Sequence, residues 1–284
     1  MWIAGARPRT LPAAISPVIV GTALAYRIGI HVSYLNALLA LVVSLSLQIA
    51  VNYANDYSDG IKGTDEVRVG PIRLVGSGLA SAHTVKNAAL ISFIFAAVAG
   101  SILAMRTSYI LILIGIVAIF AAWTYTGGAK PYGYRGFGEI SVFLFFGVVA
   151  TVGTAYAATQ RVTWQAFLLS IPVGALSCAI LAINNLRDLP KDSLVGKRTL
   201  AVRMGDFKAR AFFISLLALA HIASFLAIVI TPWAIATLLL FPITLQIATS
   251  IIKGAQGVEL IPLLGKTGRL QLLISTTLAI ALLI

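Results

Sequence analysis

The sequence predicts an all-α, polytopic membrane protein, with nine transmembrane helices around a central cavity that opens to the cytoplasmic side. Three observations support this fold class. Of the 284 residues 59% are hydrophobic and 11% are charged, and the mean hydropathy is +0.96. A soluble domain of this size carries far more polar surface. Long apolar runs follow one another along the whole chain, and nearly all acidic residues are confined to the ends of a few of these runs.

Nine apolar runs are long enough to cross a hydrocarbon core, which takes about 20 helical residues. We expect one domain over residues 1–284, built from two pseudo-repeats. The predicted helices cover residues 11–28, 35–56, 85–105, 108–126, 138–158, 164–186, 209–230, 232–252 and 269–284.

Three of these segments need justification. The first follows Arg7 and Arg9, so a cleaved signal peptide is the alternative interpretation. Its apolar stretch is long and eight more such stretches follow, which favours a transmembrane helix that is not cleaved. Thr231-Pro232 separates two adjoining runs, because proline marks a tight turn there. The last run begins late and is barely long enough. Cys178 is the single cysteine, so no intramolecular disulfide can form.

The distribution of basic residues predicts the orientation in the membrane. With a cytoplasmic N-terminus, only Arg27, Arg106 and Arg161 of the 21 Lys and Arg residues fall on the opposite face, together with the C-terminus. Cytoplasmic loops of membrane proteins carry an excess of Lys and Arg, so we expect a multi-pass protein of the cell inner membrane in this orientation. All nine carboxylates then also lie on the cytoplasmic side.

The net charge of +12 has two interpretations. One is a set of topogenic residues near anionic membrane lipid, and the other is a pocket for a polyanionic substrate. Both are expected to hold. Neither requires nucleic acid, and we expect no nucleic-acid partner.

Two polar clusters close two of the predicted helices. The first reads Asn52-Tyr53-Ala54-Asn55-Asp56-Tyr57-Ser58-Asp59, and the second runs from Asn184-Asn185 to Asp192. Their helices are four places apart in the predicted order and therefore run in the same direction, so both clusters reach the same side of the membrane.

The spacing within each cluster places its oxygen ligands together. Asn52 and Asp56, Asp56 and Asp59, and Asn184 and Asp188 are separated by three or four residues, a spacing that shares a helix face. Pro190 is expected to place Asp192 in the loop just beyond the helix. Acids are unfavourable at a helix C-terminus by about 0.3–1 kcal/mol each, so a cation must offset them. Carboxylate and carboxamide oxygens suit Mg²⁺, which completes its shell with substrate phosphates. The predicted metal ligands are Asn52, Asn55, Asp56, Asp59, Asp65, Asn184, Asp188 and Asp192.

Three predicted cytoplasmic loops supply basic and hydroxyl donors for such a substrate. Two of them follow the two clusters. The third runs from Gly127 to Gly136, where glycines permit close backbone approach and tyrosines can donate to phosphate. With the N-terminal arginines added, the candidate substrate-binding residues are Arg7, Arg9, Lys62, Arg68, Arg73, Lys130, Tyr132, Lys197 and Arg198.

The two clusters resemble the two aspartate-rich motifs of the UbiA-type intramembrane prenyltransferases, in Asn55-Asp56-x-x-Asp59 with Asp65 beyond it, and in Asp188-x-x-x-Asp192. The Arg7-Pro8-Arg9 segment, the Gly70-Pro71-Ile72-Arg73 segment, and Lys197-Arg198-Thr199-Leu200 further resemble the branch of this family that uses 1,4-dihydroxy-2-naphthoate as acceptor. The likeness runs from about residue 5 to the last helices.

The resemblance implies an enzyme, its cofactor and its partners. It implies Mg²⁺-dependent transfer of a polyprenyl group from a polyprenyl diphosphate to 1,4-dihydroxy-2-naphthoate in menaquinone biosynthesis, with loss of carbon dioxide, in contact with membrane lipid. Asp56, Asp59, Asp188 and Asp192 are then the catalytic, metal-holding carboxylates. One of Arg7, Arg9, Arg68 and Arg73 would pair with the naphthoate carboxylate.

Alternatives remain from the residues alone. A related prenyltransferase with another aromatic acceptor shares the aspartate clusters. Asp56-Tyr57-Ser58-Asp59-Gly60 resembles the start of a phosphatidyl-alcohol synthase motif, but Ile61-Lys62 follows where that family has Ala-Arg. A secondary transporter also pairs polar helices from two halves, usually near the bilayer midplane rather than at one end of the helices.

Overall fold

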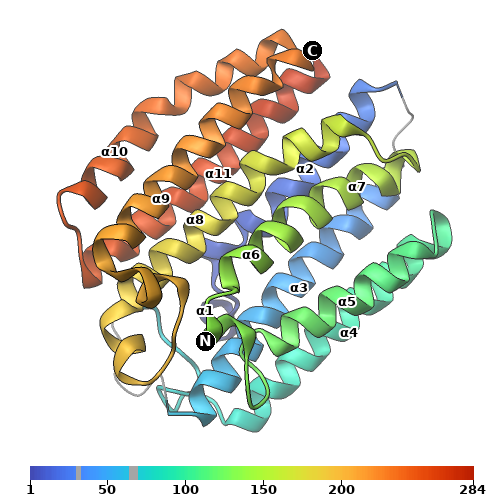
Figure 1. Cartoon of the computed structure of the whole chain (residues 1–284). Helices are drawn as coiled ribbons and strands as arrows, with labels where there is room; N and C mark the ends of the chain where they lie inside the picture. The colour runs from blue at the N-terminus through green and yellow to red at the C-terminus, as the bar shows by residue number, and fades with distance from the viewer. Residues whose placement is uncertain (30–32, 64–69) are drawn as a thin grey trace.

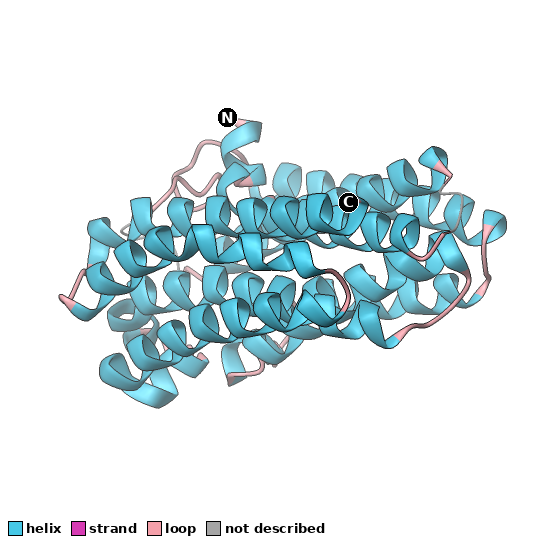
Figure 2. Cartoon of the chain, turned by 90° about the horizontal axis from the view of Figure 1, so that it is seen from above, coloured by secondary structure: helices cyan, strands magenta, loops and turns pink. Residues whose placement is uncertain are grey.

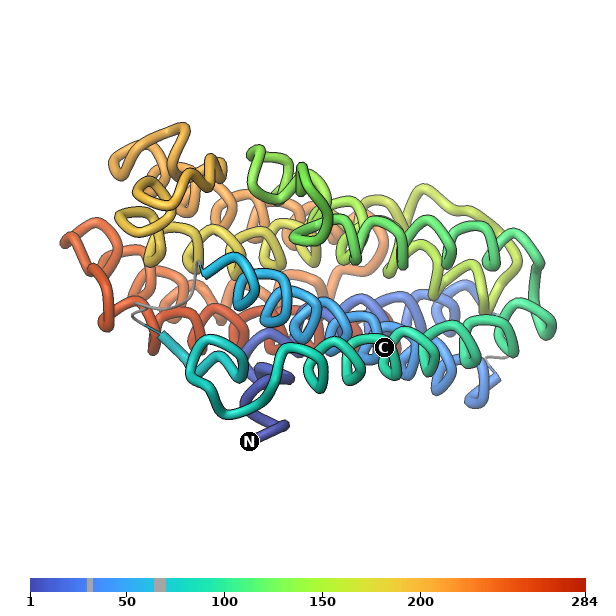
Figure 3. Tube along the Cα trace, turned by 90° about the horizontal axis from the view of Figure 1, so that it is seen from below, coloured from blue at the N-terminus to red at the C-terminus, as the bar shows by residue number. Residues whose placement is uncertain are grey.

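The computed structural model describes residues 1–29, 33–63 and 70–284 as a bundle of helices, in which the described residues contain no strand (Figure 2). The helices run roughly along one another, and the polar loops gather at one end of the bundle together with the N-terminus (Figures 1 and 3). We call this the loop end. The C-terminus lies at the other end, which we call the far end. The predicted site residues Asp65 and Arg68 fall outside the described residues.

The N-terminal half begins with a short α1 (Trp2–Ala6) and a 3₁₀ turn (Pro8–Thr10), both at the loop end. Three predicted helices follow as expected, within a few residues at each end. They are α2 (Pro12–Arg27), α3 (Tyr34–Ile61) and α4 (Ala82–Arg106). The fourth, α5 (Ile110–Thr124), is shorter than a full span. Ser33 and Ser81 begin α3 and α4 by accepting hydrogen bonds from the amides of Asn36 and Thr84, the ordinary N-cap arrangement.

The fifth predicted helix is one continuous segment with a change of winding. It consists of α6 (Gly138–Val142), a π-helical stretch (Phe143–Val149) and α7 (Ala150–Thr159). A Cβ at Gly147 would lie 2.6 Å from the Cα of Gly174 on α8, so only glycine allows this contact. The wide turn thus lies where the two backbones meet, consistent with π-bulges marking special sites in helices.

The helix α8 (Trp164–Leu194) corrects one expectation. It continues through Pro190, so Asp192 lies in the helix and shares a face with Asp188. A proline removes one helical hydrogen bond and strains the preceding turn, but here the helix continues to its C-cap, where the Val195 amide donates to the Lys191 carbonyl.

The C-terminal helices start earlier than predicted. The helix α9 (Leu200–Leu226) contains a kink at Gly205, whose φ of 76° and ψ of 167° are essentially restricted to glycine. A 3₁₀ turn (Ala227–Val229) ends it, and the turn expected at Thr231-Pro232 is confirmed. A 3₁₀ segment (Pro232–Leu240) then leads into α10 (Phe241–Ile252).

The last helix, α11 (Leu260–Leu283), follows a single 3₁₀ turn (Gly257–Glu259) and begins nine residues before the predicted start. Its start was predicted at residue 269 because Lys266 and Arg269 interrupt the apolar pattern. In the fold, Gly268 packs against the Arg9 carbonyl of the N-terminal segment, so this stretch is a helix that faces the site.

Six segments in the described part of the chain are long and apolar enough to cross a membrane by themselves, so the chain is a multi-pass membrane protein. They are Tyr34–Ile61, Ala82–Arg106, Gly138–Thr159, Trp164–Leu194, Leu200–Val229 and Pro232–Ile252. The helices α2 and α5 are shorter, and α11 carries charge in its first half.

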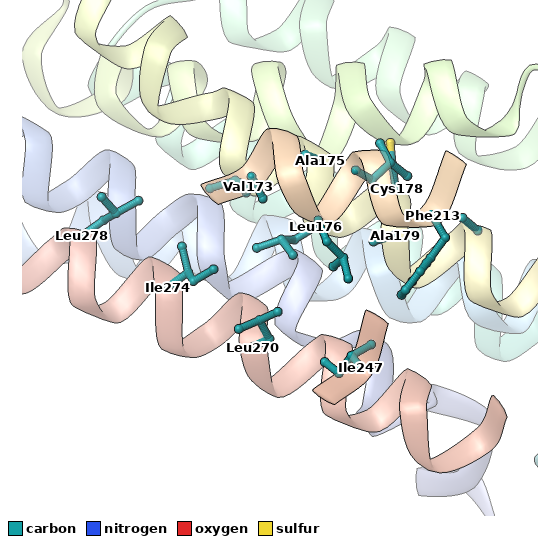
Figure 4. Close-up of a cluster of buried hydrophobic side chains, with 14 of the residues drawn as sticks. Val173, Ala175, Leu176, Cys178, Ala179, Phe213, Ile247, Leu270, Ile274 and Leu278 are labelled. Carbon is teal, nitrogen blue, oxygen red and sulfur yellow. The ribbon is translucent and has the colours of Figure 1, made fainter. Parts of the chain in front are cut away.

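The main apolar core joins α2, α8, α9 and α11. Leu176, Phe213, Leu270 and Ile274 are fully buried there, and Figure 4 shows their side chains converging between these helices. A second, smaller cluster holds α3 against α4 around Tyr53, Leu74 and Phe93. Packing in lipid relies on such close contacts rather than on water exclusion, so these clusters hold the ends of α3 and α8 in place.

Candidate active site

Two cavities meet between the ends of α3 and α8. The first, which we call the polar cavity, has a volume of about 520 Å³ and lies at the loop end. The second, the apolar cavity, has a volume of about 320 Å³ and extends toward the far end between α3, α4, α5 and α7. Their linings share Arg7, Thr10, Asn55, Tyr125, Leu181 and Asn184. We call these six residues the junction.

The first cluster divides between the two cavities. Asn55 and Asp59 line the polar cavity, and Asn52 lines the apolar cavity. Asp56 lines neither. It is fully buried, and its two carboxylate oxygens accept the backbone amides of Leu74 and Val75 at 2.8 and 3.0 Å. Asp56 therefore holds the loop after α3 against the helix.

Asp59 is the most heavily engaged carboxylate of the polar cavity. One oxygen accepts Lys197 Nζ at 3.0 Å and the hydroxyl of Tyr134, and the other lies 3.7 Å from the guanidinium of Arg73. Asp59, Arg73 and Lys197 are all buried. A buried carboxylate is stable only when its charge is paired and its oxygens accept hydrogen bonds, and these contacts meet both conditions.

The second cluster is held by an arginine that the sequence analysis left without a role. Arg187 donates from Nε and Nη2 to the two oxygens of Asp188, both at 2.8 Å, in a bidentate pair. Such a planar pair fixes both side chains. Asn185 donates to the buried Glu139 at 2.9 Å, which ties α8 to α6. Asn184, Asp188 and Asp192 all line the polar cavity.

The N-terminal segment closes the site from one side because Asn52 binds it. Its amide donates to the Ala6 carbonyl at 2.9 Å and to the Thr10 hydroxyl at 3.2 Å, while its Oδ1 accepts Gln48 at 3.4 Å. Arg7 donates to the Asn52 carbonyl at 3.1 Å and has a left-handed backbone (φ 53°), which is uncommon outside glycine. Asn52 thus orients Arg7 at the junction.

The loop after α5 forms the opposite wall. Lys62 donates to the Thr126 carbonyl at 2.8 Å, and the ammonium groups of Lys62 and Lys197 lie 4.8 and 4.6 Å from the ring centroid of Tyr134. Thr126 also donates to Asn55 at 2.7 Å. Cation–π contacts of this kind hold the ring between two positive charges.

Burial changes the titration of several groups in this wall. Partial desolvation of its ammonium group by the surrounding wall lowers the pKa of Lys62, although the residue as a whole is exposed, and Asp59 opposes this effect while Lys197 reinforces it. Burial also raises the pKa of Tyr125, with Glu139 adding to the shift, and it raises the pKa of Tyr132. Both phenols therefore remain protonated at neutral pH. Tyr132 donates to the Ala121 carbonyl at 2.9 Å and lies 2.8 Å from the Ser141 hydroxyl.

The predicted substrate-binding residues are only partly assembled. Arg7, Arg9, Arg73 and Lys197 line the polar cavity, and Tyr132 lines the apolar cavity. Three others, Lys62, Lys130 and Arg198, are exposed and line neither cavity. Arg198 is joined to this region through its backbone amide, which donates to the Tyr134 carbonyl at 2.9 Å.

Sequence reasoning overlooked several lining residues. Arg187 and Lys191 belong to the second cluster, but the sequence assigned them no role, and both line the polar cavity. Thr10 and Gln48 lie at the contact between the N-terminal segment and α3. The signal for Gln48 was present, since it is four residues before Asn52 and shares its helix face.

The donor chemistry of the polar cavity fits magnesium. Its lining offers carboxamide and carboxylate oxygens from both clusters, in Asn55, Asp59, Asn184, Asp188 and Asp192, and Mg²⁺ prefers hard oxygen ligands. In the described residues no three His, Cys, Asp or Glu side chains form a ready-made metal cluster. Mg²⁺ commonly uses one or two carboxylates with substrate phosphates rather than such a cage.

A multi-helix membrane fold with two facing aspartate clusters defines the class of protein. Residues 14–261 match the UbiA prenyltransferase family, and the chain belongs to this family. Among its relatives are the 1,4-dihydroxy-2-naphthoate octaprenyltransferases of Mycobacterium tuberculosis, 49% identical over 99% of this chain and 96% of that protein, and of Escherichia coli, 37% identical over 94% and 89%.

Solved structures show the same fold at low sequence identity. A UbiA homolog from Aeropyrum pernix K1 in its apo form aligns with a TM-score of 0.73 at 14% identity, over 95% of this chain and 96% of that one. A UbiA homolog from Archaeoglobus fulgidus bound to DMAPP and Mg²⁺ aligns with a TM-score of 0.65 at 15% identity, over 99% and 98%.

Proposed function

We propose that this protein transfers a polyprenyl group from polyprenyl diphosphate to 1,4-dihydroxy-2-naphthoate in menaquinone biosynthesis. The observation that carries this proposal is the junction, where a charged cavity opens directly into an apolar one. An amphipathic donor with a diphosphate head and a hydrocarbon tail needs such a pair of spaces. The relatives named 1,4-dihydroxy-2-naphthoate octaprenyltransferase support the choice of acceptor.

The charge of the polar cavity suits the diphosphate. Among the described residues, six basic side chains and three aspartates line it. The basic residues are Arg7, Arg9, Arg73, Arg187, Lys191 and Lys197, and the aspartates are Asp59, Asp188 and Asp192. The formal excess of positive charge attracts a polyanion, and the partly desolvated site strengthens each interaction. Arg187 and Arg73 can turn from their aspartates to phosphate oxygens when the donor binds.

Magnesium would be held by Asn55 and Asp59 on α3 and by Asn184, Asp188 and Asp192 on α8. When bound, it neutralises charge on the diphosphate and so makes this group a better leaving group. The lysines and arginines of the cavity contribute to the same end, because fixed positive charge stabilises the negative charge that develops on the departing oxygen. Asp56 supports the site from behind through the Leu74 and Val75 amides.

The bond changes follow from this arrangement. The carbon–oxygen bond of the donor breaks, its electron pair leaves with the diphosphate, and the resulting allylic cation lies at the junction beside Tyr125. The ring face of Tyr125 stabilises a cation. The aromatic acceptor forms the new carbon–carbon bond. Its carboxylate leaves as carbon dioxide and the electron pair stays on the ring, so the substitution on the ring neither gains nor loses a proton, and the departing diphosphate takes up its proton from water.

The acceptor needs a cation for its carboxylate near the allylic carbon. Arg7 lines both cavities and is held in place by Asn52, so we assign it this role. Arg9 and Arg73 lie in the polar cavity only, where they favour the diphosphate.

The orientation and the full set of membrane spans belong to the same proposal. Nine helices surround the cavities when α2, α5 and α11 also cross the bilayer, and the loop end faces the cytoplasm. The positive-inside rule supports this orientation. Arg27, Arg106 and Arg161 lie at the ends of α2, α4 and α7 remote from the site, and Arg106 donates to Asn36 at the far end.

Purified protein in lipid nanodiscs tests the activity. With geranylgeranyl diphosphate, Mg²⁺ and carboxylate-labelled 1,4-dihydroxy-2-naphthoate, we expect labelled carbon dioxide, diphosphate and a prenylated product in equal amounts, and none of them after chelation of Mg²⁺. para-Hydroxybenzoate, the matched control acceptor, should give little product. Prenylation of para-hydroxybenzoate in preference to the naphthoate would assign the protein to another branch of the family. If no diphosphate is released from the donor with any acceptor, the proposed enzymatic activity is contradicted.

A further inference from the structure

Three glycines line the apolar cavity from three different helices. They are Gly100 on α4, Gly115 on α5 and Gly153 on α7. A Cβ at Gly115 or Gly153 would meet no other atom within 4 Å, and one at Gly100 would touch only Val43, at 3.7 Å. The space beside each glycine is therefore open.

Close helix packing does not account for these glycines. In membrane helices glycine usually permits two backbones to approach, as Gly147 does against Gly174, where a Cβ would lie 2.6 Å from the opposing Cα. Gly100, Gly115 and Gly153 have no such neighbour. Glycine also lowers helix stability relative to alanine, so its presence at three cavity-lining positions has a local cost without a packing benefit.

Two of the glycines lie at a similar depth from the junction. Gly115 is ten residues before Tyr125, which is about 15 Å along a helix that rises 1.5 Å per residue. Gly100 lies beside Val43, and Val43 is twelve residues before Asn55, about 18 Å along α3.

The third glycine extends this ring to the other wall. Gly153 is twelve residues beyond Ser141, which is at most about 18 Å, because the π-helical stretch between them rises less per residue than an α-helix. Ser141 also lines the apolar cavity and contacts Tyr132 near the site. The three open positions thus lie at about the same level of the cavity, on α4, α5 and α7.

We propose that Gly100, Gly115 and Gly153 determine how long a prenyl tail the enzyme accepts, by keeping the apolar cavity open beyond this level. The inference rests on the proposed function. A geranyl tail has an eight-carbon main chain and spans at most about 11 Å at roughly 1.5 Å per carbon–carbon bond, so it ends before the glycines. A geranylgeranyl tail, at most about 23 Å long by the same estimate, passes between them.

The test compares two donors in variants of the full-length protein in nanodiscs. Gly115 and Gly153 are each replaced by Ala, Leu and Phe, a series of increasing size. Val117→Phe is the matched control, because Val117 is two residues from Gly115, is about half exposed and does not line the cavity. The readout is the ratio of kcat/KM for geranylgeranyl diphosphate to that for geranyl diphosphate, which does not depend on the folded fraction.

We expect this ratio to fall by about tenfold or more in the Leu and Phe variants, since a filled pocket discriminates at least this strongly between ligands of different length. Val117→Phe should leave it unchanged. An unchanged ratio in the largest variant that still transfers geranyl would overturn the proposal, as would loss of both activities already at Gly→Ala. Failure of the proposed function can be told apart from failure of the tail-length proposal, because in the first case the unmodified protein would prenylate the naphthoate with neither donor.

Discussion

Single residues within one motif perform different tasks in this structure. Asp56 and Asp59 both belong to the first cluster, and both were predicted to hold metal and to act in catalysis. Asp59 lines the polar cavity, whereas Asp56 is fully buried and its oxygens are engaged by two backbone amides. The predicted catalytic role of Asp59 stays a prediction, and the contacts of Asp56 favour a supporting role.

The substitution Asp56→Asn tests this distinction. An asparagine offers one acceptor oxygen, so the amide of Leu74 or of Val75 loses its buried partner, at a cost of about 1–3 kcal/mol in unfolding free energy. Asp206→Asn is the matched control, because the Asp206 carboxylate is exposed and its pair with Arg210 one turn away contributes at most about 1 kcal/mol. Thermal unfolding in detergent should show a lower midpoint for Asp56→Asn alone. An unchanged midpoint with lost turnover would instead place Asp56 in the chemistry.

Arg7 is the residue we expect to bind the naphthoate carboxylate. Arg7→Gln leaves that anion without its cation, which should weaken acceptor binding by roughly 2–5 kcal/mol. The measured signature is a large rise in the KM for the naphthoate with little change in the KM for the prenyl diphosphate. Arg27→Gln, at the end of α2 remote from the site, is the control. A rise confined to the KM of the diphosphate would assign Arg7 to the donor.

At the scale of elements, the ends of α3 and α8 create the site. Both helices remain intact far beyond their apolar runs, to Ile61 and Leu194, so their polar last turns stand over the cavities instead of fraying into loops. The continuation of α8 through Pro190 brings Asp192 onto the face of Asp188. The sequence analysis ended this helix too early because it gave proline its usual weight as a helix breaker.

The orientation of these elements in the membrane is testable by labelling. In a Cys178→Ala background, a cysteine in place of exposed Ser193 at the end of α8 should be shielded from an impermeant thiol reagent in intact cells, and one in place of Thr107 between α4 and α5 should react. The physical reason is that 17 of the 20 basic residues that the structure describes lie toward the Ser193 side, which the positive-inside rule assigns to the cytoplasm. Permeabilised cells provide the control, since both cysteines should then react. The reverse pattern in intact cells would invert the orientation.

At the scale of the whole molecule, much of the fold was predictable because apolar runs of membrane length are a strong signal. Helices α2, α4 and α5 follow their predicted ranges within three residues, and α3 continues five residues beyond its predicted end. The early starts of α9 and α11 were not predictable, because residues 200–208 carry three charged side chains and residues 260–268 contain Pro262, two glycines and Lys266. Gly205 permits this in α9 by taking a backbone conformation that other residues avoid.

The candidate site was predictable in its composition more than in its contacts. The sequence indicated that Asn55, Asp59, Asn184 and Asp188 would come together, and all four line one cavity. It did not indicate that Arg187 pairs with its own neighbour Asp188. Adjacent residues on a helix usually point in different directions. The pair forms because the long Arg187 side chain turns back toward the Asp188 carboxylate.

A double-mutant cycle can show whether α3 and α8 hold one shared magnesium–diphosphate site. Mg²⁺-dependent binding of geranyl diphosphate is measured for the unmodified protein, Asp59→Asn, Asp188→Asn and the double variant. If both aspartates serve one site, each single change should weaken binding by about tenfold or more, and the double variant should be scarcely weaker than either, because residues that act as a unit are strongly non-additive. Fully additive losses, or a single variant that binds the Mg²⁺ complex as tightly as the unmodified protein, would contradict the shared site.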